Sequence, residues 1–240
     1  MQYGVIVDLE TTGVDAKNNE IIEVGLLEFC HENFENPSIT RVYAGLSEPQ
    51  KPLEEIIKKV TGLSDEVLRG QSIDWSIVHD MMARAQVIIA HNAAFDRGFL
   101  ENEPRYMAQK PQGRWACSQS HIDWKKLGFK SRALNYLACD HGFVNPFAHR
   151  ALFDCATTFR VIGPHLKELY ETSLLKEFEV AAVGAPFAVK DTLKSHGYRW
   201  DPERRVWAKR LFENRLAEER DFLQAEIYKG PSMHAEVALS

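Results

Sequence analysis

The chain has 240 residues, of which 45% are hydrophobic and 26% are charged, and its formal net charge is −5. These values are typical of a globular protein with one substantial domain and room for a small second one. No apolar run approaches the roughly 20 residues that cross a bilayer, and no basic patch precedes an apolar segment at the N-terminus. We therefore expect no membrane span, no secretory signal and a cytoplasmic location. The four cysteines form no CxxC pair, which favours free thiols.

The first two thirds of the chain predict strands first and then strands that alternate with helices. Apolar runs predict three successive strands at 3–10, 21–30 and 39–44. After these strands the pattern predicts helices at 52–60 and 74–85, a strand at 86–92, a helix from 93, a strand at 114–117, helical segments at 118–127 and 132–141, and a long helix at 149–171. This order indicates an α/β fold with a mixed sheet covered by helices.

The C-terminal part of the chain differs in pattern and in charge. Periodicity weakens at 172–186, so we place a domain boundary there and expect a small α+β module at 186–230 and a loose tail at 231–240. Residues 186–215 carry eight Lys or Arg against four Asp or Glu. The module is predicted to contain a hairpin in which Trp200 and Trp207 share one face. We assign the tryptophans to the module's own core and the basic side chains to contact with a nucleic-acid strand.

The stretch VIVDLETTG (5–13) ends a predicted buried strand with two carboxylates. Because side chains alternate across a strand, Ile6, Asp8 and Glu10 share one face. Two neighbouring carboxylates raise each other's pKa unless a cation lies between them, and hard divalent ions prefer carboxylate oxygens. Taken alone, the pair fits a metal site and a solvated strand end equally well.

Two later stretches also have two interpretations. IIAHNAAFD (88–96) places Asp96 near the start of a helix, where helix capping would explain the acid as well as a site would. HRALFD (149–154) places His149 and Asp154 within about one and a half helical turns, which also fits an ordinary helix start. A zinc site is a weaker interpretation of the Cys and His residues; its members would be Cys139, His141, His149 and Cys155.

Together, DLETTG, HNAAFD and HRALFD closely resemble, in order and spacing, the three motifs of the DEDDh exonucleases, also called the DnaQ-like family. The third motif matches the H-x-A-x-x-D form of the histidine branch through His149, Ala151 and Asp154. The resemblance covers about residues 3–170. It implies that residues 1–172 form a ribonuclease-H-like mixed five-stranded sheet flanked by helices.

The resemblance also implies the chemistry of the site. Two divalent ions, Mg²⁺ with Mn²⁺ able to substitute, would be held by Asp8, Glu10, Asp96 and Asp154. His149 would be the general base that takes a proton from the attacking water. Residues implied to contact the terminal nucleotide are Leu9, Thr11, Val60, Thr61, Gly62, His91, Asn92 and Phe95. Thr61 stands where many family members have His, and a structural role at the strand end fits His91 and Asn92 equally well.

The resulting prediction is a metal-dependent 3'-5' exonuclease that hydrolyses DNA at single-stranded or frayed ends to nucleoside 5'-monophosphates. DNA is favoured over RNA because HNAAFD followed by RGFL resembles the proofreading and exonuclease X branches of the family. A 3'-5' exoribonuclease is the alternative, because the motifs do not report on the 2'-hydroxyl. A non-catalytic nucleic-acid-binding module is a weaker alternative, because all five motif residues are present. A homodimer and a polymerase or repair partner are left open.

Overall fold

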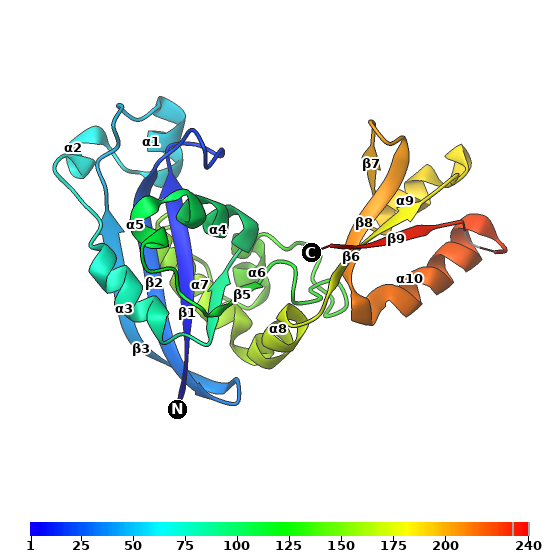
Figure 1. The fold of residues 1–240 in the computed structure, drawn as a ribbon, viewed down its shortest axis with the longest axis horizontal. Coiled ribbons are helices and arrows are strands. Elements are labelled where there is room, and N and C mark those ends of the chain that lie inside the picture. The colour runs from blue at the N-terminus through cyan, green and yellow to red at the C-terminus, as the bar shows by residue number, and fades with distance from the viewer. Residues whose placement is uncertain (232, 240) are drawn as a thin grey trace. The chain divides into compact units, whose positions relative to one another are not determined.

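The computed structural model describes residues 1–231 and 233–239 (Figure 1). The chain divides into two compact units, Met1–Ser173 and Leu174–Ser240, and each is described by itself. In the described part of the chain, no helix has both the length and the apolar character that a membrane span requires.

The N-terminal unit is built on a mixed five-stranded sheet with the strand order β3-β2-β1-β4-β5. Strand β1 pairs antiparallel with β2 and parallel with β4, β2 pairs antiparallel with β3, and β4 pairs parallel with β5. The strands are β1 Gln2–Thr11, β2 Ile21–Glu32, β3 Glu35–Leu46, β4 Val87–Ala90 and β5 Arg114–Cys117. All five predicted strands are confirmed, and so is the predicted ribonuclease-H-like architecture.

Helices cover both faces of this sheet (Figure 1). Val5, Val7 and Leu9 point to one face and pack against the first group of helices, α3 Trp75–Ala83, α4 Ala93–Asn102 and α5 Pro104–Met107. Ile6 and Leu27 point to the other face and pack against the second group, α6 Leu134–Asp140, α7 Ala151–Ile162 and α8 Leu166–Ser173. The short helices α1 Glu55–Thr61 and α2 Asp65–Leu68 border a small cluster of Leu53, Leu63 and Leu68 around Ile22 at the start of β2.

Two helix predictions are wrong. Residues 118–127 form turns and no helix: the Trp124 indole donates to the Ser118 carbonyl (2.7 Å), and Asp123 accepts from the Lys126 amide (3.2 Å). Side chain–backbone bonds of this kind compete with helical ones. The single helix predicted at 149–171 is divided by a 3₁₀ turn at Gly163–His165. Pro164 explains the division, since it has no amide hydrogen for an i→i−4 bond.

The C-terminal unit has its own four-stranded sheet, in the order β7-β8-β6-β9. Its elements are β6 Glu177–Ala182, α9 Lys190–Ser195, β7 Arg199–Asp201, β8 Val206–Phe212, α10 Leu216–Phe222 with a π-helical continuation Leu223–Tyr228, and β9 Ala235–Leu239. Apolar side chains of α9, α10 and the π-helical turn pack on β6 and β8 around Val180, Leu193 and Leu223. A small second sheet with helices on it agrees with the predicted α+β module.

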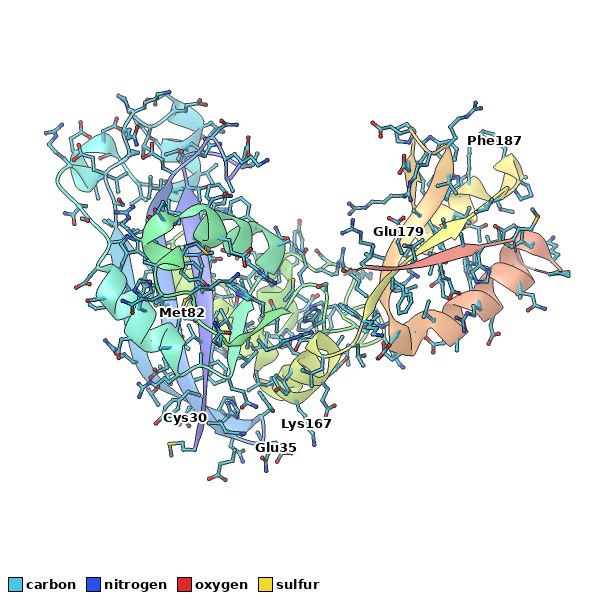
Figure 2. All side chains as sticks on the ribbon, in the orientation of Figure 1. Cys30, Glu35, Met82, Lys167, Glu179 and Phe187 are labelled. Carbon is cyan, nitrogen blue, oxygen red and sulfur yellow. The ribbon has the colours of Figure 1, made fainter. Side chains whose placement is uncertain are left out.

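The predicted tryptophan hairpin forms, and its two rings have different environments. Trp200 of β7 lies opposite Trp207 of β8, with ring centroids 5.6 Å apart. Trp207 packs against the core of the C-terminal unit, as expected, whereas the Trp200 residue is 49% exposed. Phe187, labelled in Figure 2, is also exposed, and the Lys190 ammonium lies 4.4 Å from its ring centroid.

The limits of the C-terminal module differ from the expectation. Strand β6 lies inside the stretch that we expected to be a boundary, and β9 lies inside the expected tail. Both strands depend on long-range pairing, because β6 is central and its neighbours β8 and β9 follow 24 or more residues later. Local pattern alone therefore gave no sign of either strand.

Candidate metal-binding active site

Strand β1 brings Asp8 and Glu10 to the sheet face that carries α7. Ile6, two residues before Asp8, packs in the core beneath α6, α7 and α8, so the predicted alternation places both carboxylates on that same side. Glu10 is only 9% exposed and Asp8 is half-buried. Asp8 lies opposite Gly25 of β2, and Glu10 lies opposite Glu23.

Helix α4 contributes a third carboxylate, Asp96, from its first turn. Its Oδ1 accepts a hydrogen bond from the amide of Leu9, at 3.1 Å. This bond joins the start of α4 to the β1 residue between the first two acids. Asp96 is 2% exposed, whereas an ordinary helix cap is solvated.

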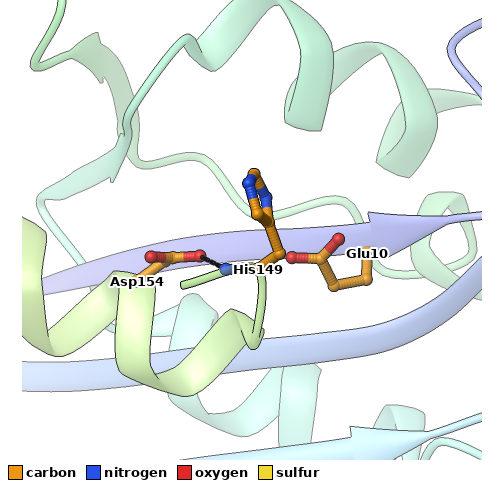
Figure 3. Close-up of side chains that lie close together, drawn as sticks. All are labelled: Glu10, His149 and Asp154. Atoms are coloured by element: carbon orange, nitrogen blue, oxygen red, sulfur yellow. Dashed lines mark hydrogen bonds between the residues drawn. The ribbon is translucent and has the colours of Figure 1, made fainter. Parts of the chain in front are cut away.

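The start of α7 contributes His149 and Asp154. The His149 amide donates to Oδ2 of Asp154 (2.9 Å), and the Asn145 side chain donates to Oδ1 (2.7 Å). His149 has a positive φ of 62°, and its side chain is exposed. Figure 3 shows the His149 ring beside the Glu10 and Asp154 carboxylates. One ligand atom from each of Glu10, His149 and Asp154 lies within 4.8 Å of the others.

Burial raises the pKa of every acid in this group, and the charges of neighbouring acids add to the shift at Asp8, Glu10 and Asp154. Burial, reinforced by nearby acids, raises the pKa of Glu10 to about 8. Burial also raises the pKa of Asp96 to about 8, against its backbone hydrogen bonds. The pKa of Asp8 is well above its usual range because of burial and the charges of four neighbouring acids. Burial likewise raises the pKa of Asp154, although its hydrogen bonds oppose the shift.

This donor set fits a hard divalent cation. Within residues 1–231 and 233–239, no Lys or Arg lies within ion-pair distance of Asp8, Glu10, Asp96 or Asp154. Buried acids without a counter-ion are costly, and carboxylate oxygens are the ligands that Mg²⁺ and Mn²⁺ prefer. In the same part of the chain, Glu10, His149 and Asp154 form the only group of three acid, His or Cys side chains close enough to share an ion. Asp8 and Asp96 lie outside that 4.8 Å set but interact with it electrostatically.

The weaker zinc interpretation gains nothing from this geometry. In the described residues, the three-residue ligand group contains no cysteine. Cys155, which that interpretation required, is buried, and its thiol points to the carbonyl oxygens of Gly25 (3.3 Å) and Ile6 (3.6 Å). Its contacts are those of a residue that packs α7 onto the sheet.

A fifth buried acid, Glu23, was missed by the sequence analysis. It is 2% exposed and faces Glu10 across β1 and β2, but Arg150 offsets its charge. Its negative charge raises the pKa of both Asp8 and Glu10. An acid in the apolar run IIEVGLLEF was the only available signal, and Arg150 lies 127 residues away in the sequence.

Three residues predicted to contact the terminal nucleotide lie beside the acids in the sequence. Leu9 is almost fully buried in the core on the α3–α5 side, so little of its side chain is left to contact a base. The Thr11 hydroxyl donates to the Gly13 carbonyl (2.6 Å), which closes the turn after β1. Phe95 is half-buried and its ring centroid lies 4.9 Å from that of Phe99.

The predicted residues 60–62 lie at the end of α1. Val60 is exposed, and Gly62 ends the helix with a left-handed φ of 70°. The Thr61 hydroxyl donates to the Ile57 carbonyl (2.9 Å) and accepts from the Leu63 amide (3.1 Å). Leu63 packs against Ile22, next to Glu23 in β2, so this segment lies at the end of the sheet that carries Glu10.

His91 and Asn92 complete the predicted set. The ring nitrogens of His91 bond to the Ser118 hydroxyl (2.8 Å) and to the Arg132 carbonyl (2.9 Å). Burial lowers the pKa of His91 to about 4, so this ring is neutral at physiological pH. Asn92 is exposed and has a φ of 81° at the start of α4. These contacts favour the structural interpretation of His91, which ties the end of β4 to the turns after β5.

Comparison with protein families gives a match over most of the N-terminal unit. The family model described as Exonuclease matches residues 5–162. Among curated proteins, the DNA polymerase III PolC-type protein of Halalkalibacterium halodurans is 29% identical over 179 residues. That match spans 71% of this chain but only 12% of the polymerase, so the chain covers a small part of this relative's length.

Solved structures share the fold at low sequence identity. The complex of Escherichia coli ExoI with single-stranded DNA, in its zinc-bound form, has a TM-score of 0.58 at 13% identity and covers 77% of this chain and 48% of that chain. A 3'-exonuclease that recognises the histone mRNA stem-loop has a TM-score of 0.54 at 15% identity. The match covers 70% of this chain and 64% of that chain. One of these two relatives is complexed with DNA and the other recognises RNA, so the shared fold does not discriminate between the two substrates.

Proposed function

The chain belongs to the Exonuclease family, and from that premise we propose that it is a metal-dependent 3'-5' exonuclease that hydrolyses DNA to nucleoside 5'-monophosphates. One observation carries the proposal. Four buried or half-buried carboxylates gather at one end of the sheet with no Lys or Arg at ion-pair distance in the described residues, and the exposed His149 lies beside two of them. This is the arrangement that a two-metal phosphodiesterase requires.

Asp8, Glu10, Asp96 and Asp154 would hold two divalent ions, with Mg²⁺ the preferred ion and Mn²⁺ able to substitute. Bound there, the ions would supply positive charge at the scissile phosphate and favour ionisation of the attacking water. The hydrogen bonds that Asp154 and Asp96 accept fix the orientation of both carboxylates. His149 would take the proton of the attacking water, because its ring is solvent-accessible and adjacent to Glu10 and Asp154.

The terminal nucleotide would lie against the surface around these acids. Phe95 offers an aromatic face one residue before Asp96, and Val60 offers an exposed apolar side chain on a segment at the same end of the sheet. Thr11, Gly62, Asn92 and the backbone of Leu9 would complete the contact. Stacking of this kind tolerates any base and is worth roughly 1–3 kcal/mol per base.

The preference for DNA over RNA rests on the motif resemblance and on the DNA polymerase named as a relative. An exoribonuclease is the second candidate, because a 3'-exonuclease that recognises an mRNA stem-loop has the same fold. We expect the protein to be cytoplasmic.

The test uses single-stranded DNA and RNA oligonucleotides of one sequence, labelled at either the 5' or the 3' end, with Mg²⁺ or with EDTA. We expect a ladder from the 5'-labelled DNA and immediate release of labelled mononucleotide from the 3'-labelled DNA, both lost in EDTA and in Asp8→Asn. His149→Ala should slow the reaction by about 10²–10⁴-fold. Degradation of RNA alone would keep the chemistry and overturn the substrate. Failure to cleave either strand would overturn the enzyme and favour a binding module.

A further inference from the structure

Glu23 of β2 holds the first residues of α7 by hydrogen bonds from Arg150 and Ala151. Arg150, at the N-cap position of α7, places Nε 3.1 Å from Oε2 of Glu23 and Nη2 3.1 Å from Oε1. The amide of Ala151 donates to Oε2 at 3.3 Å. Bonds from both guanidinium nitrogens to both carboxylate oxygens fix direction as well as distance. One buried side chain therefore anchors both the side chain of Arg150 and the backbone that follows it.

The backbones of β2 and α7 approach each other closely beside this contact. A Cβ atom at Gly25 would lie 2.4 Å from the carbonyl carbon of Ala151, so only glycine lets α7 start directly on β2. The register of the sheet places Gly25 opposite Asp8 and Glu23 opposite Glu10. The start of α7 is therefore attached to the same stretch of sheet that presents the first two acids.

His149 lies between two anchors. Its own amide is bonded to Asp154, and the next residue, Arg150, is bonded to Glu23. Its φ of 62° is uncommon for a residue with a side chain, and such a conformation persists where the surrounding contacts maintain it. Because the His149 ring is exposed, its position depends on this backbone more than on packing.

We propose that Glu23 is a positioning residue that acts through Arg150 and Ala151 to hold the His149 ring beside Glu10 and Asp154. The inference rests on the proposed function, in which His149 takes the proton of the attacking water. It also distinguishes Glu23 from the four acids of the metal site. Glu23 makes a two-point ion pair with Arg150, whereas none of those four acids has a Lys or Arg at ion-pair distance in the described residues.

The chain offers a matched control on the same strand. Glu28 is fully buried in β2, and its carboxylate accepts hydrogen bonds from Nε (2.7 Å) and Nη2 (2.8 Å) of Arg84. Glu23→Gln and Glu28→Gln each remove one buried charge from a two-point Arg contact, so both should destabilise the N-terminal unit. We expect Glu23→Gln to lower kcat for DNA hydrolysis about 10- to 100-fold with little change in KM, because small displacements of a reacting group are costly. Glu28→Gln should stay within about twofold of the wild type.

A double-variant cycle tests whether Glu23 acts through His149. In a His149→Gln background, adding Glu23→Gln should change kcat by less than about threefold, because residues that act as a unit are not additive. A loss as large as in the wild-type background would overturn the proposal. Arg150→Lys, which keeps the charge and removes the two-point geometry, should lower kcat in the same direction. It also serves as the test variant if Glu23→Gln does not fold.

Two further measurements do not use activity. NMR of metal-free protein with labelled histidine rings should show the His149 signal, assigned by its loss in His149→Gln, shifted or broadened in Glu23→Gln and unchanged in Glu28→Gln. Calorimetry should show that Glu23→Gln still binds Mg²⁺, because Glu23 is not one of the proposed ligands. Lost Mg²⁺ binding, or an unmoved His149 signal, would overturn the positioning role. Wild-type protein that cleaves no strand would overturn the proposed function instead, and the NMR result would still stand.

Discussion

Glu219 in the C-terminal unit and Glu10 in the N-terminal unit are buried to a similar extent, at 4% and 9% exposure. Glu219 accepts hydrogen bonds from the Tyr198 hydroxyl (2.8 Å) and the Lys209 ammonium (2.5 Å), and His196 lies 3.4 Å from it. Glu10 has three acids acting on it, and burial together with their charges raises its pKa to about 8. A buried carboxylate that the protein pairs with a cation serves the fold, whereas one that is left unpaired and has a raised pKa indicates a cation from outside.

The same comparison holds inside the N-terminal unit. Glu23 and Glu28, both buried in β2, are offset by Arg150 and Arg84. Only the group around Glu10 is left without a Lys or Arg partner in the described residues. The protein therefore neutralises buried acids elsewhere, and the exception lies where three family motifs meet. If the comparison is right, removing a charge should have opposite effects on stability at the two kinds of position.

The largest effect is expected from Glu10→Gln. We expect hydrolysis to fall at least about 10²–10³-fold, because one ligand of the proposed ions is lost. In the absence of metal and above about pH 8, where Glu10 is ionised, the same change should stabilise the protein by about 1 kcal/mol, because it removes one of several repelling charges. Urea unfolding in EDTA, beside an assay in Mg²⁺, measures both. A variant that is inactive and also less stable without metal would contradict the proposed repulsion.

Glu219→Gln should instead destabilise the C-terminal unit. It leaves Lys209 charged and partly buried without its partner, and breaking a buried ion pair costs about 3–5 kcal/mol. The free energy of unfolding of the C-terminal unit should therefore fall by several kcal/mol. Hydrogen exchange of the β6 and β8 amides measures this change. Exchange that stayed as slow as in the wild type would show that Glu219 is not needed for stability. The amides of β1 and β2 serve as the internal reference.

Features of the two units that depend on local sequence could be predicted, whereas features that depend on long-range contacts could not. Strands β1, β2 and β4 of the N-terminal unit contain apolar runs, and the three motifs carried enough pattern to name Glu10, His149 and Asp154, which the structure brings together. Glu23 could not be assigned, because its partner Arg150 is known only once α7 is docked on β2. The same reason applies to β6 and β9, whose pairing spans the whole module. The 118–127 turns depend on the buried ring of Trp124.

Stability should also depend on pH and metal. Burial raises the pKa of Glu10 and Asp96 to about 8, above their ordinary values near 4. Folding therefore favours their protonated forms, so their stabilising contribution is complete below about pH 4 and is lost as pH rises through 8. We expect the metal-free protein to lose at least about 2 kcal/mol across this range, or roughly 4–8 °C in Tm.

Saturating Mg²⁺ should oppose this loss, because ligands that bind only the folded state stabilise it. Thermal scans from pH 5 to 8, with EDTA or with Mg²⁺, make the measurement. Glu28→Gln is the control, since its pair lies outside the acid group and should leave the pH dependence unchanged. A metal-free protein whose stability does not change between pH 5 and 8 would show that the four acids are not held together as described.

The smallest effect is expected from the C-terminal unit's contact with a nucleic-acid strand. Trp200 is 49% exposed at the hairpin, and Arg205, at the turn before β8, is exposed with a φ of 52°. If bases stack on Trp200, Trp200→Ala should weaken binding of single-stranded DNA by about 1 kcal/mol, or roughly fivefold, without changing its salt dependence. Arg205→Gln should instead reduce the salt slope by about 0.7, the value for one phosphate contact with a single strand.

Fluorescence anisotropy in EDTA, which stops hydrolysis, separates the two effects over a range of salt concentrations. Val183→Ala is the control, because Val183 is an exposed apolar residue of the same unit without an aromatic ring. If Trp200→Ala and Val183→Ala bind equally well, the exposed ring is not a stacking surface. If Arg205→Gln also leaves the salt slope unchanged, neither residue of the hairpin contacts the strand, and the excess positive charge of this module must act elsewhere or not at all. The contrast between the units would then be sharper, with strand binding confined to the unit that contains the unpaired acids.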